Sequence, residues 1–214
     1  MSKTIFVTAT NTDIGKTYAT LLLLEEFAKR GYRVGAFKPI ETGVENIPKD
    51  GLKLYQKSIE LNPNFSSIDI KDVTPITFSL PAAPFVAKKN RPIDFKKISE
   101  AFKKISDVCD IVIVEGAGGL LVPIEKDFFM VDFIKLFDAT PLLVTHDKLG
   151  CINDTLLSIN IFKQKSIPFV WCINKRDRSD NFKMITLDYY KHSFEDIYFL
   201  ESNIETIVNK LLIT

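Results

Sequence analysis

The chain has 214 residues, of which 46% are hydrophobic and 26% charged, and its formal net charge is +1. This length and composition predict one domain over residues 1–214 with a sizeable core, and exclude disordered and fibrous classes. The near-neutral charge gives no reason to expect a nucleic acid or a membrane as partner. No long apolar run or signal-peptide pattern is present, and Cys109, Cys151 and Cys172 form neither a metal pattern nor a disulfide framework, so a cytoplasmic protein is expected.

The hydrophobic pattern predicts strands that alternate with helices. Strands are expected over residues 5–9, 33–37, 73–78, 111–114, 141–145 and 168–174. Helices are expected over residues 16–30, 50–61, 94–106, 129–137, 151–165, 181–190 and 203–212. This alternation implies right-handed crossovers and a mostly parallel sheet with helices on both faces. Ligands of such sheets bind at the carboxyl ends of the strands.

A phosphate-binding loop is predicted after the first strand. The segment ATNTDIGKT, residues 9–17, follows an apolar strand and opens a helix. Backbone N–H groups and the helix N-terminus can cradle phosphates there, while Lys16 can reach the outer phosphates and the Thr17 hydroxyl can hold Mg²⁺. Ala9 replaces the usual first glycine, and the loop is one residue longer than the common spacing. The context still favours a P-loop over a chance Gly-Lys-Thr, and with it a three-layer, P-loop NTPase-like α/β fold.

Glu115 is a candidate magnesium ligand. It follows the buried run IVIV, residues 111–114, and precedes the glycine-rich segment GAGG, residues 116–119. Mg²⁺ prefers carboxylate, hydroxyl, phosphate and water oxygens, and glycines let the backbone approach a ligand closely. The alternative is a solvated glutamate at a strand exit, but the nearby P-loop favours the metal role.

Lys38 stands at the exit of the second strand and is a candidate catalytic residue. A positive charge there would stabilise the charge that develops during phosphoryl transfer. The alternative is an ordinary surface lysine before a turn. Asp50, further along, is one of many acids and is equally suited to cap a helix.

Two later strand exits carry weaker signals. The segment KLGCIN, residues 148–153, lies between a strand and a helix, where uncapped N–H groups suit a carboxylate; a plain turn is the simpler interpretation. Asn174 ends the last strand, and its amide can read a base edge or make a turn. His146 and His192 accompany no catalytic triad and no zinc spacing, so structural roles are expected for both.

Taken together, these motifs resemble those of dethiobiotin synthetases from residue 1 to about residue 175. The resemblance rests on the P-loop ending DIGKT at 13–17, on KPIETG at 38–43, on VEGAGG at 114–119 and on KLGCIN at 148–153. The P-loop is only moderately specific. The last motif, in its order after the others, is highly specific.

The resemblance implies an ATP- and Mg²⁺-dependent ligase that makes dethiobiotin, ADP and phosphate from 7,8-diaminononanoate and CO₂. One amine takes up CO₂ as a carbamate, ATP phosphorylates the carbamate to a mixed anhydride, and the second amine closes the ring. No protein nucleophile is needed, so the protein's tasks are positioning and charge stabilisation. The family acts as a homodimer with its active site at the subunit interface.

The resemblance also implies a role for each matching position. Lys16 and Lys38 would stabilise the transferring phosphoryl group, and Thr17, Asp50 and Glu115 would hold Mg²⁺. The full ATP-binding set is Thr12, Asp13, Ile14, Gly15, Lys16, Thr17, Tyr18, Asp50, Glu115, Gly116, Ala117, Gly118 and Asn174. The substrate-binding set is Thr42 together with Leu149, Gly150, Cys151, Ile152 and Asn153, the last five acting on substrate held by the partner subunit.

The end of the chain departs from the family pattern. The usual Gly-x-Ile-Pro-like stretch near the adenine has no clear counterpart, and residues 194–200 read FEDIYFL instead. This difference suggests the hypothesis that selectivity for the base is weaker or built differently, while phosphate and metal binding are kept.

Three other classes compete with this interpretation. A switch ATPase of the partitioning or division-site type would carry an extra lysine early in the P-loop, which residues 10–12 lack, and some members end in a basic amphipathic helix, whereas residues 201–214 hold one basic residue and two glutamates. An amide-forming synthase of cobalamin biosynthesis would need a glutaminase domain as well. A binding module with an inactive P-loop is opposed by the presence of Lys16, Thr17 and Glu115.

Overall fold

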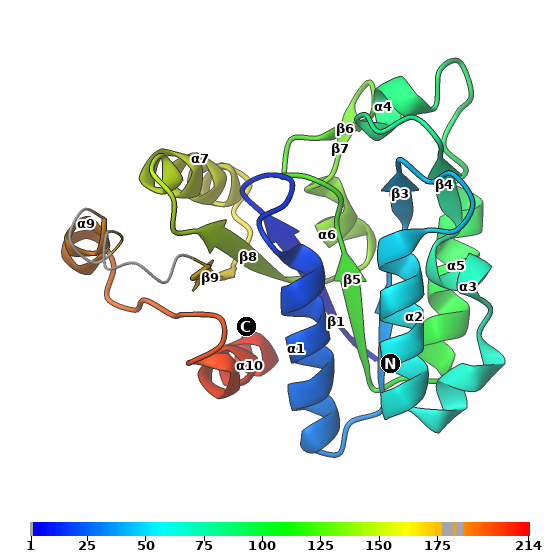
Figure 1. Ribbon diagram of the computed structural model, residues 1–214, viewed down its shortest axis with the longest axis horizontal. Helices are drawn as coiled ribbons and strands as arrows, with labels where there is room; N and C mark the ends of the chain where they lie inside the picture. Colours follow the sequence, from blue (N-terminus) through cyan, green and yellow to red (C-terminus); the bar gives the residue numbers. More distant parts are fainter. Residues whose placement is uncertain (1, 177–181, 183–185) are drawn as a thin grey trace.

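The computed structural model describes residues 2–176, 182 and 186–214. Its centre is a five-stranded sheet in the order β2-β5-β1-β8-β9, in which every neighbouring pair is parallel (Figure 1). The strands are β1 (Lys3–Ala9), β2 (Val34–Phe37), β5 (Ile111–Glu115), β8 (Thr140–His146) and β9 (Val170–Asn174). The P-loop strand β1 therefore lies in the middle of the sheet.

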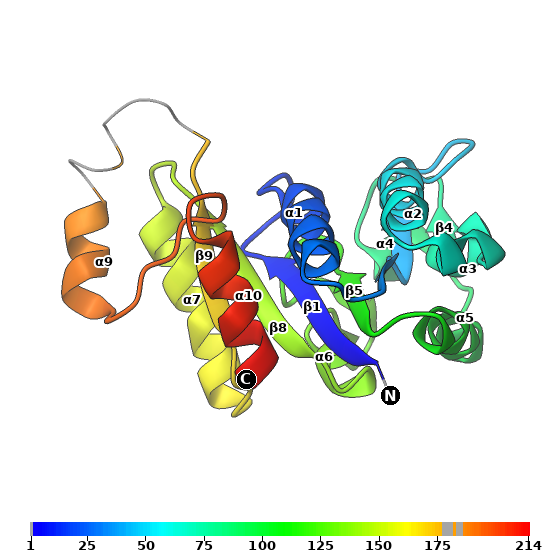
Figure 2. The same cartoon turned by 90° about the horizontal axis from the view of Figure 1, so that it is seen from below.

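Helices cover both faces of this sheet (Figure 2). One face carries α1 (Lys16–Lys29), α2 (Lys49–Leu61) and α10 (Ile204–Ile213), and the other carries α5 (Phe95–Asp107), α6 (Asp132–Leu136) and α7 (Cys151–Gln164). The predicted α/β class with a parallel sheet between two helical layers is confirmed.

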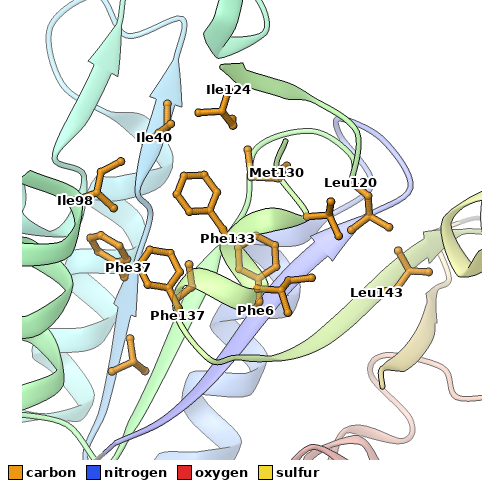
Figure 3. Packing of buried hydrophobic residues seen from close by; sticks show 14 of the residues in the cluster. Phe6, Phe37, Ile40, Ile98, Leu120, Ile124, Met130, Phe133, Phe137 and Leu143 are labelled. Atoms are coloured by element: carbon orange, nitrogen blue, oxygen red, sulfur yellow. The ribbon is translucent and has the colours of Figure 1, made fainter. Parts of the chain in front are cut away.

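The alternation of side chains along each strand creates the two halves of the core. Ile5 and Val7 of β1 face the α1 side, whereas Phe6 faces the α5 and α6 side. On the latter side Phe133 and Phe137 stack with ring centroids 5.5 Å apart, and Phe37 meets Phe137 edge-on at 5.7 Å (Figure 3). Apolar residues on both faces of each strand explain why the central strands read as continuous hydrophobic runs.

Smaller elements lie around the central sheet, several of them at the carboxyl ends of its strands. They include β3 (Ile40–Thr42) paired in parallel with β4 (Ile76–Phe78), β6 (Pro123–Glu125) paired with β7 (Phe128–Phe129), the 3₁₀ helix η1 (Pro63–Ser67), and the helices α3 (Ile70–Val73), α4 (Pro84–Ala87) and α9 (Leu187–Ser193). Among the described residues no helix is both long and apolar enough to cross a bilayer.

Two expected elements were wrong at their ends. The strand expected over 73–78 starts only at Ile76, because Asp69 caps a short helix that ends at Val73 and Pro75 follows it. The helix expected over 129–137 starts only at Asp132, because residues 128 and 129 pair with β6 instead. The helix expected over 181–190 falls partly on residues 181 and 183–185, outside the described residues.

Candidate active site

A cavity of about 740 Å³ opens at the carboxyl ends of the central strands. The starts of α1 and α2 lie at this end of the sheet (Figure 1). Residues from the P-loop, from the exit of β2, from β3, from α2 and from the end of β5 line it. Parallel strands place all their exits at one edge of the sheet, so residues distant in the sequence converge there. This is the position that the sequence predicts for the ligand.

The P-loop has the backbone needed to wrap a phosphate. Asp13 and Gly15 both have positive φ angles, of 59° and 106°, and Gly15 directly precedes α1. A Cβ on Gly15 would lie 2.2 Å from the side-chain nitrogen of Asn174, so only glycine fits this position. The Lys16 ammonium folds back over the loop and donates to the carbonyl of Asn11 at 3.0 Å. The loop thus turns its backbone N–H groups and Lys16 toward the cavity, as a nest for an anion.

Lys38 and Glu115 form a buried ion pair at the floor of the cavity. The Lys38 Nζ lies 2.6 Å from the Glu115 Oε1 and 3.9 Å from Asp50 Oδ2, and the exposed fractions of Lys38 and Glu115 are 3% and 1%. Burial by itself would lower the pKa of Lys38, but the carboxylates of Glu115 and Asp50 outweigh it and the pKa is raised. Lys38 therefore keeps its positive charge in the site.

Lys16 has a different electrostatic environment. Burial, reinforced by the neighbouring charge of Lys38, lowers the pKa of Lys16 to about 8, although Glu115 and Asp50 act in the opposite direction. Two ammonium groups thus converge on one cavity. Such a pair is suited to an anion with several negative charges, because each phosphate oxygen that enters relieves the repulsion between them.

The residues predicted to hold Mg²⁺ fit that ion. The Thr17 hydroxyl donates to Glu115 Oε1 at 3.0 Å, and Asp50 Oδ2 lies 3.9 Å from the Lys38 Nζ that pairs with Glu115. The second oxygen, Glu115 Oε2, is buried and finds no hydrogen-bond partner among the described residues. A buried carboxylate oxygen of this kind calls for a partner, and one hydroxyl with two carboxylates is the oxygen donor set that Mg²⁺ prefers.

The structure brings most of the predicted nucleotide residues together. Those that line the cavity are Thr12, Asp13, Gly15, Lys16, Thr17, Tyr18, Lys38, Asp50, Glu115, Ala117 and Gly118, with Thr42 from the substrate set. Ile14, Gly116 and Asn174 lie behind the lining: Gly116 donates its backbone N–H to β1, and Asn174 donates its amide to the Ile14 carbonyl at 2.7 Å.

The predicted residues 149–153 do not line this cavity. They form the turn into α7, where Gly150 has a φ of 96° and no side chain caps the helix. Leu149 is 92% exposed, whereas Cys151 is buried. The segment therefore presents an uncapped helix start outside the cavity that the P-loop and Lys38 line.

Sequence reasoning missed four residues that line the cavity: Leu21, Glu41, Lys53 and Arg176. Glu41 lies inside the KPIETG motif, so its position next to Lys38 was a usable signal. Lys53 lies one helical turn after Asp50, which places both on one face of α2. Arg176 donates to the carbonyl of Asp13 at 2.8 Å, a contact across 163 positions that no local pattern indicates.

The unusual C-terminal segment lies beside the P-loop. Residues 198–200 pair with the outer edge of β9, through backbone bonds from Ile173 to the Tyr198 carbonyl and from Leu200 to the Ile173 carbonyl. Next to this bridge, the hydroxyl of Tyr18 in α1 donates to Glu201. The segment is thus anchored both to the last strand of the sheet and to the first turn of the P-loop helix.

Comparison with known proteins agrees with this site. A family model described as AAA domain matches residues 3–207. The chain is 47% identical over 190 residues to the ATP-dependent dethiobiotin synthetase BioD of Sulfurovum sp. (strain NBC37-1), covering 89% of this chain and 90% of the relative. It is 35% identical to the BioD of Helicobacter pylori, covering 86% and 87% of the two chains, and 34% identical to BioD 1 of Escherichia coli, covering 81% and 78%.

Solved structures share the fold at low sequence identity. The MinD cell division protein of Aquifex aeolicus matches with a TM-score of 0.54 at 18% identity, covering 97% of this chain and 86% of that one. A plasmid partition protein of Borrelia burgdorferi matches with a TM-score of 0.58 at 12% identity, covering 99% and 98%. These similarities show a P-loop fold and no more. The family model and the sequence relatives go further: the chain belongs to the ATP-dependent dethiobiotin synthetases, ligases of the P-loop NTPase superfamily.

Proposed function

We propose that this chain makes dethiobiotin from 7,8-diaminononanoate and CO₂ at the expense of ATP. One amine of the substrate adds to CO₂ and becomes a carbamate. The γ-phosphoryl group passes to a carbamate oxygen, giving a carbamic-phosphoric mixed anhydride and ADP. The second amine then attacks the carbamate carbon, the cyclic urea closes, and phosphate leaves with the former carbamate oxygen.

One observation carries this proposal: Lys16, Lys38, Thr17, Asp50 and Glu115 line a single cavity next to Thr42. Phosphoryl transfer spreads negative charge over the transferring oxygens, and the two lysines supply positive charge on that side. Because Lys38 is buried against Glu115, its ammonium is already oriented before any ligand enters. Thr42, at the end of β3, lines the same cavity, which supports the proposal that its hydroxyl contacts the substrate.

Thr17, Asp50 and Glu115 are the residues that would hold Mg²⁺. The ion, when bound, would supply positive charge against the negative charge of the phosphates. The chain's own contribution is to keep the Glu115 carboxylate and the Thr17 hydroxyl together, with one buried Glu115 oxygen left without a partner among the described residues, and to hold Asp50 close to Lys38.

We also propose that two copies of the chain complete each site. The turn into α7, residues 149–153, lies outside its own chain's cavity, yet an uncapped helix start suits the carboxylate of the substrate. A second hollow of about 510 Å³ lies between the 119–123 loop and α7. Leu121 and Leu157 line it and are 54% and 59% exposed, and Leu149 stands exposed just ahead of α7. Exposed leucines grouped in this way favour burial against another protein surface.

The first experiment is phosphate release from Mg-ATP with bicarbonate, with and without 7,8-diaminononanoate. The proposal predicts phosphate release that requires the diamine and yields dethiobiotin. Lys38→Ala, which removes a catalytic charge that lies outside the P-loop segment, should lose most of this diamine-dependent release. Hydrolysis that does not depend on the diamine, or none from folded protein, would contradict the proposal and favour a switch ATPase.

A further inference from the structure

Glu41 is a buried carboxylate in the cavity for which the mechanism above has no task. It belongs to β3, immediately before Thr42, and is 7% exposed. Both of its oxygens are occupied: Oε1 accepts from the backbone N–H of Asp50 at 3.1 Å, and Oε2 accepts from the N–H of Gly51 at 2.9 Å. Its side chain therefore clamps the first turn of α2, the turn that carries Asp50.

This clamp replaces a cap that α2 lacks. The residue before the helix is Pro48, and no side chain of the helix's own N-terminus bonds to the first turn. The first N–H groups of a helix have no partner within it, and a carboxylate there is stabilised by the helix dipole. Glu41, from β3, provides both the hydrogen-bond acceptors and the negative charge. It therefore holds the start of α2 against β3.

The opposite side of the same turn is equally constrained. A Cβ added to Gly51 would lie 2.1 Å from the Thr74 hydroxyl oxygen and 3.3 Å from Glu41 Oε2. The first turn of α2 is thus held between Thr74 and Glu41. Because β3 begins two residues after Lys38, the short segment 38–41 carries both Lys38 and Glu41, the residue that clamps the turn of Asp50.

Glu41 differs from Glu115 in what its oxygens leave open. Glu115 keeps one buried oxygen without a partner among the described residues, whereas both oxygens of Glu41 are used by backbone N–H groups. Glu41 is therefore suited to act through Asp50 and not as a ligand itself. Outer-shell carboxylates of this kind orient the groups that do bind a metal.

We propose that Glu41 is a positioning residue for the magnesium site, which fixes the first turn of α2 so that Asp50 faces Lys38 and Glu115. This inference rests on the proposed role of Asp50. The substitution that tests it is Glu41→Gln, which keeps the shape of the side chain but turns an amide N–H₂ toward one of the two backbone N–H groups. One half of the clamp is thereby lost.

The measurement is calorimetric binding of a non-hydrolysable ATP analogue, in EDTA and at graded Mg²⁺ concentrations, for the whole chain. For Glu41→Gln we expect the affinity for the analogue in EDTA to equal that of wild type. The Mg²⁺ concentration at which half of the Mg²⁺-dependent increase in affinity is reached should rise about tenfold. Glu41→Asp, which retains the charge but is shorter, should give an intermediate shift.

Glu125→Gln is the matched control. Glu125 also joins a backbone N–H, that of Ile93 at 2.8 Å, and also lies against a lysine, Lys88 at 3.0 Å, but it does not line the nucleotide cavity. Glu125→Gln should lower the midpoint temperature of thermal unfolding without changing the Mg²⁺ dependence of analogue binding. Equal Mg²⁺ shifts in Glu41→Gln and Glu125→Gln would overturn the inference, since general loosening would then explain both.

Asp50→Asn separates this inference from the function on which it rests. If Asp50→Asn shifts the Mg²⁺ dependence and Glu41→Gln does not, the positioning role of Glu41 is wrong and the metal site stands. If Asp50→Asn leaves the Mg²⁺ dependence unchanged, the proposed role of Asp50 fails and the inference fails with it. The inference is supported if Asp50→Asn and Glu41→Gln both shift the Mg²⁺ dependence of analogue binding and Glu125→Gln does not.

Discussion

The buried pair of Lys38 and Glu115 is the residue-scale feature on which the site depends. Two opposite charges that are buried together hold each other in place, but either charge alone would destabilise the folded protein, because its desolvation would not be compensated. The same geometry serves phosphate chemistry: the carboxylates of Glu115 and Asp50 raise the pKa of Lys38 and keep it protonated, and Glu115 also accepts a hydrogen bond from the Thr17 hydroxyl. Stability and activity are therefore linked through one contact.

A double substitution separates the two effects. Lys38→Met should lower kcat by about 10²–10³-fold, because it removes the charge that faces the transferring group. It should also reduce the free energy of unfolding by about 3–5 kcal/mol, since Glu115 is left buried without its partner. Adding Glu115→Gln should recover part of that stability and none of the activity, as measured by urea unfolding and phosphate release. Equal stability of the single and double variants would contradict this account.

At the scale of elements, exposed contacts join strand starts that are far apart in the sequence. Asp110, just before β5, accepts from the Arg33 guanidinium and backbone, with distances between 2.6 and 3.0 Å, and Arg33 just precedes β2. These hydrogen bonds from Arg33 lower the pKa of Asp110 to about 2. The pair sets the register at the amino end of the β2–β5 pairing.

The sign of the pH effect follows from that pKa. A carboxyl whose pKa falls from about 3.9 unfolded to about 2 folded stabilises the protein above pH ~4 and loses this contribution as the pH drops toward ~2. We expect wild type to exceed Asp110→Asn in unfolding free energy by a constant amount near neutral pH, and the difference to vanish over that acidic window. The difference is small because water screens the pair. Urea titrations at several pH values measure it, and a pH-independent difference would argue against it.

The departure of residues 194–200 from the family pattern leads to the hypothesis that selectivity for the nucleotide base is weak. Residues 198–200 extend the edge of β9, and Asn174 uses its amide nitrogen on the P-loop carbonyl of Ile14. With that donor engaged, less of the Asn174 side chain is left to read a base.

We therefore expect turnover with GTP and CTP within about one to two orders of magnitude of that with ATP, because a single missing base contact of about 1–3 kcal/mol does not exclude a nucleotide. Steady-state phosphate release with each nucleotide measures this. Strict dependence on ATP would count against weak base selectivity.

For the whole molecule, the fold alone does not choose the reaction. The MinD and partition proteins share the sheet and the P-loop at 18% and 12% identity, while the ligase relatives reach 47%. The motifs at the strand exits carry the resemblance to the ligases, and one of them, at the start of α7, lies outside its own chain's nucleotide cavity. A twofold arrangement would bring that start to the partner's nucleotide site.

Subunit mixing tests this arrangement. Lys38→Ala disables the P-loop side of a site, and Leu149→Glu places a negative charge at the α7 start, which should repel a substrate carboxylate. Mixed after unfolding and refolding, the two inactive chains should regain up to about a quarter of wild-type activity, because half of the dimers are mixed and each has one intact site. The control is Lys38→Ala mixed with Asp50→Asn, where both defects lie on the same side and no site is intact. No recovery in the first mixture, or recovery in both, would rule the shared site out.

The sequence by itself determined the features that depend on neighbouring residues. The strand, loop and helix over residues 3–29 follow from an apolar run, the GKT signature and helical periodicity, and the structure confirms them. Lys38 and Glu115 were expected at the same edge because each follows a buried strand, and they meet at 2.6 Å. Local periodicity also gave one wrong boundary: a helix was expected to begin at Phe129, but Phe129 pairs with β6 in a short strand and the helix begins only at Asp132.

Only the tertiary structure decided which distant residues share the cavity. The order β2-β5-β1 brings the exit of β2 beside that of β5, across 77 positions of chain. The packing of α2 against β2 and α1 brings its first turn to Glu41, which accepts from the backbone N–H of Asp50. Arg176 reaches the P-loop from the far end of the chain. No pattern along the chain encodes these contacts, because each depends on how whole strands and helices pack to bury their apolar faces, and polar residues at their ends are carried to wherever that packing places them.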